Sequence, residues 1–318
     1  MKALRLAVVG VGHLGRHHAR VAASLSGFQV VGVHDHHPGR AAEVGGEFSL
    51  PVLADFDEVA REAEAVVVAT PTATHAEVSR FFLDRGLHVL VEKPMTASLA
   101  EADDLVARAR KAGRVLQVGH VERYNPAIEA ALSLVASPRF IEVHRLGVFT
   151  ARSLDVDVVL DLMIHDLQIV SALVERPVRE IRAAGVPVLT PKLDIANARL
   201  EFDGGCVANL TASRVSAEKV RKCRVFAPSI YVSIDMQAQS VSAVRLVREG
   251  GRPEISPVPV PVSRGEPLAR ELADFRRAVV DGTRPLVTGE DGRDALALAE
   301  RVVAAVETHR ATFEEAPV

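Results

Sequence analysis

An aspartate and a histidine, Asp161 and His165, stand four residues apart in a strongly apolar stretch of the sequence. Four residues make about one turn of an α-helix, so we expect both side chains on one face. A carboxylate that accepts from an imidazole orients the ring and raises its basicity, and such a histidine removes the proton of a hydroxyl group. The spacing predicts His165 as a general base oriented by Asp161. A structural Asp–His pair is the alternative.

A lysine stands next to a strand-like run in the segment Glu92-Lys93-Pro94, which follows His88–Val91. In a doubly wound parallel sheet, ligands bind outside the carboxyl ends of the strands, and this places Lys93 at the mouth of a site. Its ammonium group can donate to a substrate hydroxyl and stabilise negative charge that develops on the oxygen. A surface lysine without such a role is the alternative. The peptide bond before Pro94 can be cis or trans.

A glycine-rich turn, Gly10-Val11-Gly12-His13-Leu14-Gly15, follows a strand-like run and precedes a helical pattern. Gly10 permits a tight turn, Gly12 lets the main chain approach a pyrophosphate, and Gly15 lets the helix pack close to the strand. The free N–H groups at the start of the helix attract phosphate. The turn predicts a dinucleotide site, against the alternative of a glycine turn in an α/β domain that binds nothing.

An acidic residue, Asp35, stands 20 positions after Gly15, where the second strand ends. A carboxylate there accepts hydrogen bonds from the ribose hydroxyls and repels a 2′-phosphate, which favours NAD over NADP. Arg40 lies close enough in the sequence to weaken that preference. We therefore predict NAD as the cofactor.

Five histidines near these motifs raise the question of a metal: His17, His18, His34, His36 and His37. Among them no pair has helical i, i+4 spacing, and no cysteine stands nearby to complete a site. We interpret them as solvated loop histidines and predict no metal.

The first 121 residues alternate strand-like and helix-like segments, which is typical of a doubly wound parallel sheet. Predicted strands are Leu4–Val9, Phe28–His34, Ala65–Ala69, His88–Val91 and Val115–Val118. Predicted helices follow the glycine turn, with Leu14, Val21, Ala22 and Leu25 on one face, and then run from Pro71 to about Arg85 and from Ser98 to Lys111. Ser98 is the expected N-cap of the last helix, and Gly113 ends it.

The pattern changes after residue 121. Helices are predicted at Asn125–Val135, Asp157–Leu173, Pro267–Asp281 and Glu290–His309. Between them, strict alternation at Ala196–Phe202 and a turn at Asp203-Gly204-Gly205 into Cys206–Ser213 indicate a hairpin. Further strand-like runs are Lys222–Phe226, Ile230–Met236 and Ser242–Arg248. Period-two alternation predicts an antiparallel sheet with one packed face and one exposed face.

Composition is that of a soluble globular protein. Of 318 residues, 48% are hydrophobic and 25% are charged, and the net charge is −3 without a basic stripe that would track a nucleic acid. The two cysteines, Cys206 and Cys223, cannot form a disulfide framework. No apolar stretch reaches the length of a membrane span. We expect a cytoplasmic protein that binds small molecules.

Taken in order, these motifs resemble the Gfo/Idh/MocA oxidoreductases: Gly10–Gly15, Asp35, Thr70-Pro71-Thr72 with His75, Glu92-Lys93-Pro94, and Asp161 with His165. The resemblance covers nearly the whole chain. It implies an N-terminal Rossmann domain (residues 1–121) and a C-terminal α+β domain (residues 122–318) with a large open, mainly antiparallel sheet. That sheet commonly joins subunits, which implies a homodimer or homotetramer.

The resemblance also implies roles for individual residues. Lys93, Asp161 and His165 are the expected catalytic residues and contact the substrate, together with Arg123, Tyr124 and Asn125. The expected cofactor contacts are Gly10, Gly12, His13, Leu14, Gly15, Asp35, Arg40, Thr70, Pro71, Thr72, His75, Glu92 and Lys93. Members usually carry glycines just before the catalytic aspartate, whereas Val158-Val159-Leu160 stands here. The local pocket is therefore expected to differ from that of a general sugar dehydrogenase.

Three further segments resemble the branch of the family that acts on UDP-N-acetylglucosamine: His120–Ala127, Asp161–Asp166 and Thr211–Arg214. This resemblance implies NAD-dependent oxidation of the sugar 3-hydroxyl to a ketone, which an aminotransferase then converts to a 3-amino sugar for lipid A. Arg214 meets a phosphate or forms a structural salt bridge. A dehydrogenase of free sugars or inositols is the first alternative. A non-catalytic dinucleotide-binding regulator is the second, and it would not need Lys93 and His165.

Overall fold

The computed structural model describes residues 3–150, 156–249 and 252–311. The chain folds as two compact units. The first comprises Met1–Val121 and Glu266–Asp294, and the second comprises Glu122–Gly265 and Ala295–Val318. The chain thus returns to the first unit late in the sequence, whereas the sequence analysis assigned all of residues 122–318 to the second domain.

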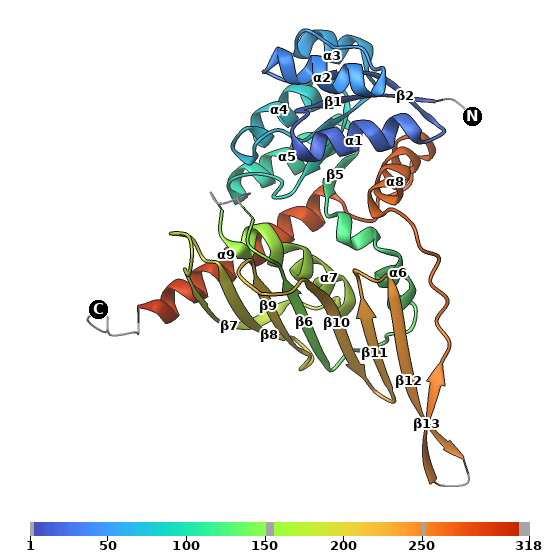
Figure 1. The fold of residues 1–318 in the computed structure, drawn as a ribbon, viewed down its shortest axis with the longest axis vertical. Helices are drawn as coiled ribbons and strands as arrows, with labels where there is room; N and C mark the ends of the chain where they lie inside the picture. The colour runs from blue at the N-terminus through green and yellow to red at the C-terminus, as the bar shows by residue number, and fades with distance from the viewer. Residues whose placement is uncertain (1–2, 151–155, 250–251, 312–318) are drawn as a thin grey trace. The chain divides into compact units, whose positions relative to one another are not determined.

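The first unit contains a five-stranded sheet in the order β2-β1-β3-β4-β5, and all of its pairs are parallel (Figure 1). The strands are β1 (Leu4–Val9), β2 (Phe28–His34), β3 (Ala65–Val68), β4 (His88–Glu92) and β5 (Leu116–Gly119). All four residues of β3 are buried, as an unbroken apolar strand covered on both faces requires. The predicted parallel sheet is confirmed.

Six helices among the described residues belong to the first unit. They are α1 (His13–Ser24), α2 (Pro38–Phe48), α3 (Phe56–Glu62), α4 (Thr72–Asp84), α5 (Leu99–Ala112) and α8 (Pro267–Asp281). The caps of α5 are as predicted, because the Ser98 side chain accepts from the Glu101 N–H and Gly113 adopts φ 62°. Helices α2 and α3 were not predicted. A signal for the start of α3 is present, since the N-cap Asp55 accepts from the Glu58 N–H at 2.7 Å, and Glu58 accepts from the N–H of Ala54, just before the cap, at 2.6 Å.

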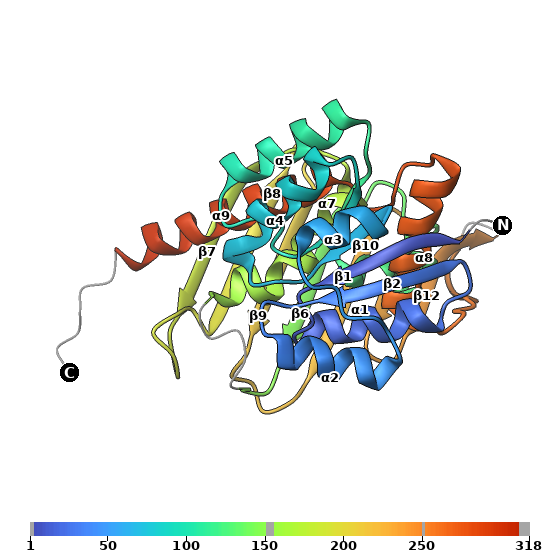
Figure 2. The same ribbon diagram turned by 90° about the horizontal axis from the view of Figure 1, so that it is seen from above.

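Helix α8 is an integral part of the first unit although it lies far along the chain. It packs beside α1 (Figure 2). Its Leu272 and Phe275 are completely buried and join the core cluster that contains Leu6 and Val8 of β1. The Arg276 side chain donates to the Gly27 carbonyl at 2.9 Å, just before β2.

The second unit is built on an eight-stranded sheet in the order β13-β12-β11-β10-β6-β9-β8-β7 (Figure 1). The strands are β6 (Phe140–Leu146), β7 (Val178–Val186), β8 (Ile195–Phe202), β9 (Val207–Ser213), β10 (Val220–Ala227), β11 (Ile230–Asp235), β12 (Ser240–Glu249) and β13 (Arg252–Val258). Only β6 and β9 pair in parallel, so the predicted mainly antiparallel sheet is confirmed. The sequence analysis did not predict β6, β7 and β13.

Helices cover one face of this sheet. They are the 3₁₀ helix η1 (Val121–Tyr124, whose first residue ends the first unit), α6 (Pro126–Leu132), the π-helix η2 (Val159–Met163), α7 (Ile164–Val174) and α9 (Gly289–Arg310), which begins in the first unit. One apolar core joins residues of α6, η2, α7 and α9 to alternate residues of the strands. In β8, for example, Ala198 and Leu200 are buried while Asn197 and Arg199 are exposed. The predicted helix Asp157–Leu173 therefore begins with a π-helical turn, and the predicted helix Asn125–Val135 is shorter at both ends.

Cys206 and Cys223 are free and buried. Burial, with the nearby charge of Asp166, raises the pKa of the Cys223 thiol to about 12. None of the helices described is both long and apolar enough to cross a membrane.

Candidate active site

The glycine turn between β1 and α1 has the geometry that its sequence predicts. Gly10 adopts φ 82°, and a Cβ on it would lie 2.7 Å from the Thr70 main-chain nitrogen. A Cβ on Gly15 would lie 1.8 Å from the Gly10 carbonyl oxygen. In contrast, a Cβ on Gly12 would meet no described atom within 4 Å. Gly10 and Gly15 thus serve close packing, and Gly12 leaves open space at the start of α1, where phosphate is favoured.

Asp35 lies at the end of β2 beside this turn, 7% exposed. Its carboxylate accepts from the Val11 N–H and from the His37 N–H, each at 2.9 Å, and Arg40 lies 3.6 Å away. Burial opposes ionisation, but these two N–H donors and the Arg40 charge outweigh it and lower the pKa of Asp35. The group is therefore a fixed acceptor, available to the hydroxyls of a ribose.

A cavity of about 520 Å³ lies over the carboxyl ends of β1, β2 and β3. Six predicted cofactor residues line it: Gly10, Gly12, Asp35, Arg40, Thr70 and Pro71. Phe56, Thr74 and Glu77 also line it, and none of the three was predicted from the sequence as a cofactor contact. His13 and Leu14 are exposed at the helix start. Of the residues predicted on one face of α1 with Leu14, Val21 and Ala22 are buried.

His75, predicted as a cofactor contact, is buried and connects two loops of the site. Its Nε2 lies 2.8 Å from the Thr70 carbonyl oxygen, and its Nδ1 lies 2.9 Å from the Pro94 carbonyl oxygen. Burial lowers the pKa of His75 against the effect of these acceptors, so the neutral ring donates to one of them at a time. The ring thus ties the loop after β3 to the loop after β4.

The Glu92-Lys93-Pro94 segment ends β4, and its Lys93–Pro94 peptide bond is cis. The Glu92 carboxylate is buried, accepts from the His18 Nε2 at 2.7 Å and accepts from the Lys93 N–H at 3.2 Å. Burial opposes its ionisation, but His18 and the Lys93 charge lower the pKa of Glu92. The interpretation of His18 as a solvated loop histidine is wrong, because its side chain is completely buried on α1. Its position on the inner face of the helix, three residues after Gly15, was the available signal.

In the second unit, Asp161 lies within η2 and His165 lies in the first turn of α7, 8% exposed. The π-helical turn is notable because such turns are frequent at functional sites. The valines that stand in place of the usual glycines, Val158 and Val159, are completely buried in the core. They anchor the start of the helix that carries both predicted catalytic residues.

A buried ion-pair network fixes α7 at the residue that follows His165. Arg145 of β6 forms two hydrogen bonds with Asp166, at 2.7 and 2.8 Å, and one with Glu122 of η1 at 2.9 Å. All three side chains are less than a tenth exposed. Arg221 also bonds Glu122 at 2.5 Å. Burial opposes ionisation of Glu122, but the charges of Arg145 and Arg221 lower its pKa. The network joins the segment before Arg123 to the segment after His165.

The three substrate residues predicted between β5 and α6 are Arg123, Tyr124 and Asn125, and their surroundings differ. Asn125 is buried, accepts from the Ala127 N–H and donates to the Met236 carbonyl, so its amide caps α6. Tyr124 is also buried. Arg123 lines a cavity of about 680 Å³ formed by the C-terminal end of α7 and the turn after β8. His165 and Asp161 do not line that cavity, so it does not bring Arg123 together with them.

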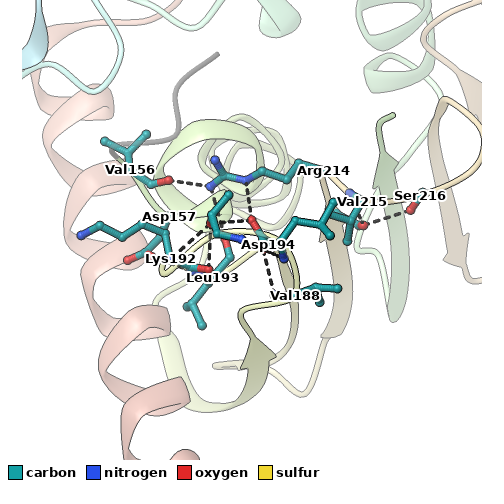
Figure 3. Close-up of polar contacts among 12 residues, drawn as sticks. Val156, Asp157, Val188, Lys192, Leu193, Asp194, Arg214, Val215 and Ser216 are labelled. Atoms are coloured by element: carbon teal, nitrogen blue, oxygen red, sulfur yellow. Dashed lines mark hydrogen bonds and ion pairs between the residues drawn. The ribbon is translucent and has the colours of Figure 1, made fainter. Parts of the chain in front are cut away.

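Arg214 forms a structural salt bridge, one of the two roles expected for it from the sequence; the other was phosphate binding. Its Nε lies 3.6 Å from the Asp194 carboxylate, and its Nη2 donates to the carbonyls of Val156 and Leu193 (Figure 3). Leu193 in turn donates its N–H to Asp157 at 2.9 Å. Arg214 therefore holds the chain just before η2.

Asp194 completes this support from the loop between β7 and β8. Its completely buried carboxylate accepts from the N–H groups of Val188, Leu189 and Thr190, at 2.6 to 2.8 Å. Burial opposes ionisation, but these donors lower the pKa of Asp194 to about 2. One carboxylate thus organises the loop that holds the chain just before η2 (Figure 3).

A parallel sheet with a glycine turn, an acidic residue at the end of β2 and an open helix start defines a dinucleotide-binding oxidoreductase domain. Comparison with known families agrees. Residues 4–120 match the oxidoreductase family described as GFO_IDH_MocA, NAD-binding Rossmann fold, and residues 135–228 match the GFO/IDH/MocA C-terminal domain. The chain belongs to the Gfo/Idh/MocA family of NAD-binding oxidoreductases, and the predictions of family, fold and NAD are confirmed.

Among its relatives, the chain is similar to the UDP-N-acetylglucosamine 3-dehydrogenase of Acidithiobacillus ferrooxidans, with 38% identity covering 96% of this chain and 97% of that protein. The solved structure of that enzyme superposes with a TM-score of 0.89 and covers 97% and 99% of the two chains. The scyllo-inositol 2-dehydrogenase (NAD(+)) of Bacillus subtilis is 28% identical over 67% of this chain and 68% of its own. An aldose-aldose oxidoreductase of Caulobacter crescentus, at 20% identity and TM-score 0.84, shares the fold.

Proposed function

We propose that this protein oxidises the 3-hydroxyl group of UDP-N-acetylglucosamine to a ketone and transfers the hydride to NAD. The observation that carries the proposal is the 38% identity to a UDP-N-acetylglucosamine 3-dehydrogenase over 96% of this chain and 97% of that protein, which includes both units. The inositol dehydrogenase matches only about two thirds of each chain. The 3-keto sugar produced is a substrate suited to an aminotransferase, in keeping with a role in lipid A synthesis.

NAD fits the residues of the first unit. Gly12 leaves the helix start open, the cavity of about 520 Å³ is of the size that ligand sites have, and Asp35 offers a fixed carboxylate beside it. When bound, the nicotinamide ring accepts the hydride from the carbon that carries the hydroxyl group. Arg40, paired with Asp35, belongs to the same region. The main chain around the site is formed by Gly10, Gly15, Thr70, Pro71 and Thr72. His75 and Glu92 support the loops of the site through their hydrogen bonds.

Three side chains remove the hydroxyl proton and stabilise the sugar oxygen in the proposed reaction. His165 accepts the proton of the sugar hydroxyl as the C–H bond gives up its hydride, so the alcohol loses two electrons and two hydrogens and becomes a ketone. Asp161 orients the imidazole of His165. Lys93 donates a hydrogen bond to the sugar oxygen and stabilises the negative charge that develops there. Arg123, Tyr124 and Asn125 are the further residues proposed to act on the substrate, and Asn125 caps α6 beside them.

Turnover assays test the proposal. Purified protein with NAD and UDP-N-acetylglucosamine should produce NADH, measured by its absorbance, and a mass spectrum should show a product two hydrogens lighter. Lys93→Ala and His165→Ala should each lower kcat by about 10²- to 10⁴-fold, while the Kd of NAD for His165→Ala stays unchanged. Activity only with inositols or free sugars would overturn the substrate. Absence of activity with every alcohol tested would favour a regulator that binds NAD.

We also propose that the protein works in the cytoplasm as a dimer or tetramer. The free, buried Cys206 and Cys223 fit a reducing compartment. Large apolar side chains on the second sheet, Phe226, Leu246 and Ile255, are exposed in the single chain, which supports its use as an interface. Sedimentation of the purified protein tests the assembly, and a Phe226→Glu variant should dissociate it. A monomeric wild type would overturn the proposal.

A further inference from the structure

Three buried titratable side chains meet beneath the Glu92-Lys93-Pro94 segment, each from a different element of the first unit. They are His18 of α1, Glu92 at the end of β4 and Glu271 of α8, and we call them the buried triad. One nitrogen or oxygen atom of each lies within 4.8 Å of those of the other two. His18 and Glu271 are completely buried. The sequence gives no hint of this meeting, because Glu271 stands 179 positions after Glu92.

Glu271 is unusual because neither oxygen of its buried carboxyl group has a hydrogen-bond partner in the described part of the chain. Its main chain is nevertheless fixed, since the Glu271 carbonyl accepts from the Gln117 side chain at 3.2 Å. Leu272 beside it is completely buried in the core. An isolated buried polar group is unfavourable, so its presence in a well-packed core calls for a function.

The charges around the buried triad determine which of its acids is ionised. Glu92 faces His18 at 2.7 Å and the positive charge of Lys93, and it stays ionised. Glu271 faces two negative charges, Glu92 and Asp274. Burial and these charges raise the pKa of Glu271 well above its ordinary value. The other titratable groups near Glu92 are His75 and His120, and burial lowers the pKa of both.

Glu92 transmits the arrangement of the buried triad to Lys93. Its carboxylate accepts from the Lys93 N–H at 3.2 Å. It packs against β5 at Gly119, where a Cβ would lie only 3.0 Å from the Glu92 carboxyl carbon, so any side chain at that position would displace it. The place of the Glu92 carboxylate therefore sets the main chain at Lys93.

We propose that Glu271 is a positioning residue for Lys93: its neutral carboxyl group lies within 4.8 Å of the Glu92–His18 pair, turns to donate to that pair, and so holds the Glu92-Lys93-Pro94 segment in place. This deepens the proposed function, because it rests on Lys93 as the residue that contacts the sugar oxygen. A neutral Glu271 leaves the buried triad with one negative charge, on Glu92, whose carboxylate lies 2.7 Å from the His18 Nε2. An ionised Glu271 would add a second, unbalanced carboxylate in the core.

Two variants separate this role from a merely structural one. Glu271→Gln keeps a neutral donor of nearly the same shape, and its kcat at neutral pH should remain within about twofold of wild type. Glu271→Leu removes the donor, and its kcat should fall about tenfold through misplacement of Lys93 while the Kd of NAD stays unchanged. The pH profile gives a second readout. Wild-type kcat should decline at alkaline pH as Glu271 ionises, and this decline should be absent in Glu271→Gln.

Infrared difference spectroscopy of wild type minus Glu271→Gln reads the proton directly and needs no sugar. A carbonyl band of a protonated carboxylic acid is expected. Absence of that band, the same alkaline decline in Glu271→Gln, or wild-type kcat in Glu271→Leu would each overturn the proposal. So would a stoichiometric divalent metal in purified wild type that Glu271→Gln lacks, since the buried triad would then be a metal site. If Glu271→Leu fails to fold, the spectrum and the pH profile of Glu271→Gln decide. Failure to oxidise any alcohol overturns the proposed function instead, because the infrared band is measured independently.

Discussion

The cofactor region of the first unit and the predicted catalytic helix of the second unit are held in place by different kinds of interaction. In the first unit, main-chain geometry does most of the positioning, through the turn Gly10–Gly15 and the N–H groups that Asp35 accepts. In the second unit, side chains from distant strands do it, through Arg145 with Asp166 and through Arg214 with Asp194.

This difference matters for what each region tolerates. A site built from main-chain groups depends on the absence of side chains, so it is sensitive to added atoms at a few glycines. A site held by buried ion pairs depends on complete pairing, because one removed partner leaves a desolvated charge. We therefore expect the removal of a charged side chain to lower the stability of the second unit most. In the first unit, the addition of a side chain at a glycine should have the largest effect.

The largest effect is expected from Arg145→Met, which leaves Glu122 and Asp166 buried without their common partner. The free energy of unfolding should fall by about 3–5 kcal/mol, measured by urea denaturation. Arg221→Met is the matched control, since Arg221 bonds the same Glu122 but is 35% exposed. It should cost about 1 kcal/mol or less. Equal losses in the two variants would contradict a network held by burial.

In the first unit, Gly15→Ala forces a Cβ against the Gly10 carbonyl oxygen, where only 1.8 Å is available. A loss of about 3 kcal/mol in the free energy of unfolding is expected, because the main chain must move. Gly46→Ala, in an exposed position of α2, should instead stabilise the protein by about 0.5–1 kcal/mol. A Gly15→Ala variant as stable as wild type would show that the turn does not depend on close packing.

A smaller, pH-dependent effect is expected at Asp194, whose pKa of about 2 lies below the ordinary value of 3.8. A lowered pKa stabilises the fold above the unfolded-state value, and this contribution disappears as the pH falls through the folded-state value. At pH 6, Asp194→Asn should therefore be about 2 kcal/mol less stable than wild type. The gap should narrow as the pH falls below about 4. A gap that stays constant from pH 6 to pH 3 would contradict a role for the ionised carboxylate.

The smallest effect concerns cofactor choice at Asp35. Asp35→Asn removes the charge that repels a 2′-phosphate and leaves Arg40 without its partner. The preference for NAD over NADP should fall by about tenfold, measured as the ratio of the two kcat/KM values. Arg40→Ala in the same background should reverse part of the gain with NADP. An unchanged ratio would show that Asp35 does not act on the ribose.

Local signals in the sequence were sufficient where one segment determines its own structure. Gly10–Gly15, Asp35 and the Ser98 cap were all readable, because each depends on neighbours within about 25 residues. The five parallel strands followed from short, mainly apolar runs that alternate with helical patterns. Two helices were missed. Helix α3 has only seven residues, although the cap at Asp55 marks its start, and α2 contains Gly39, Gly45 and Gly46, which have low helix propensity.

Long-range contacts account for what the sequence did not reveal. Nothing near Glu271 indicates that α8 lies under β4, and nothing near Asp194 indicates that it pairs with Arg214. The strand β6 was missed because its charged residue Arg145, a poor core residue alone, is compensated by partners 21 and 23 positions away. Such residues look like surface positions until the fold brings their partners together.

The return of α8 to the first unit constrains the order of events during synthesis. The core around β1 is incomplete without Leu272 and Phe275, so its apolar surface stays exposed until the ribosome has made more than 270 of the 318 residues. Folding of the cofactor domain is then a late, long-range step, of the kind that is slow and prone to aggregation. A fragment that ends at Val121 should expose this surface and aggregate, although it contains every residue of the glycine turn.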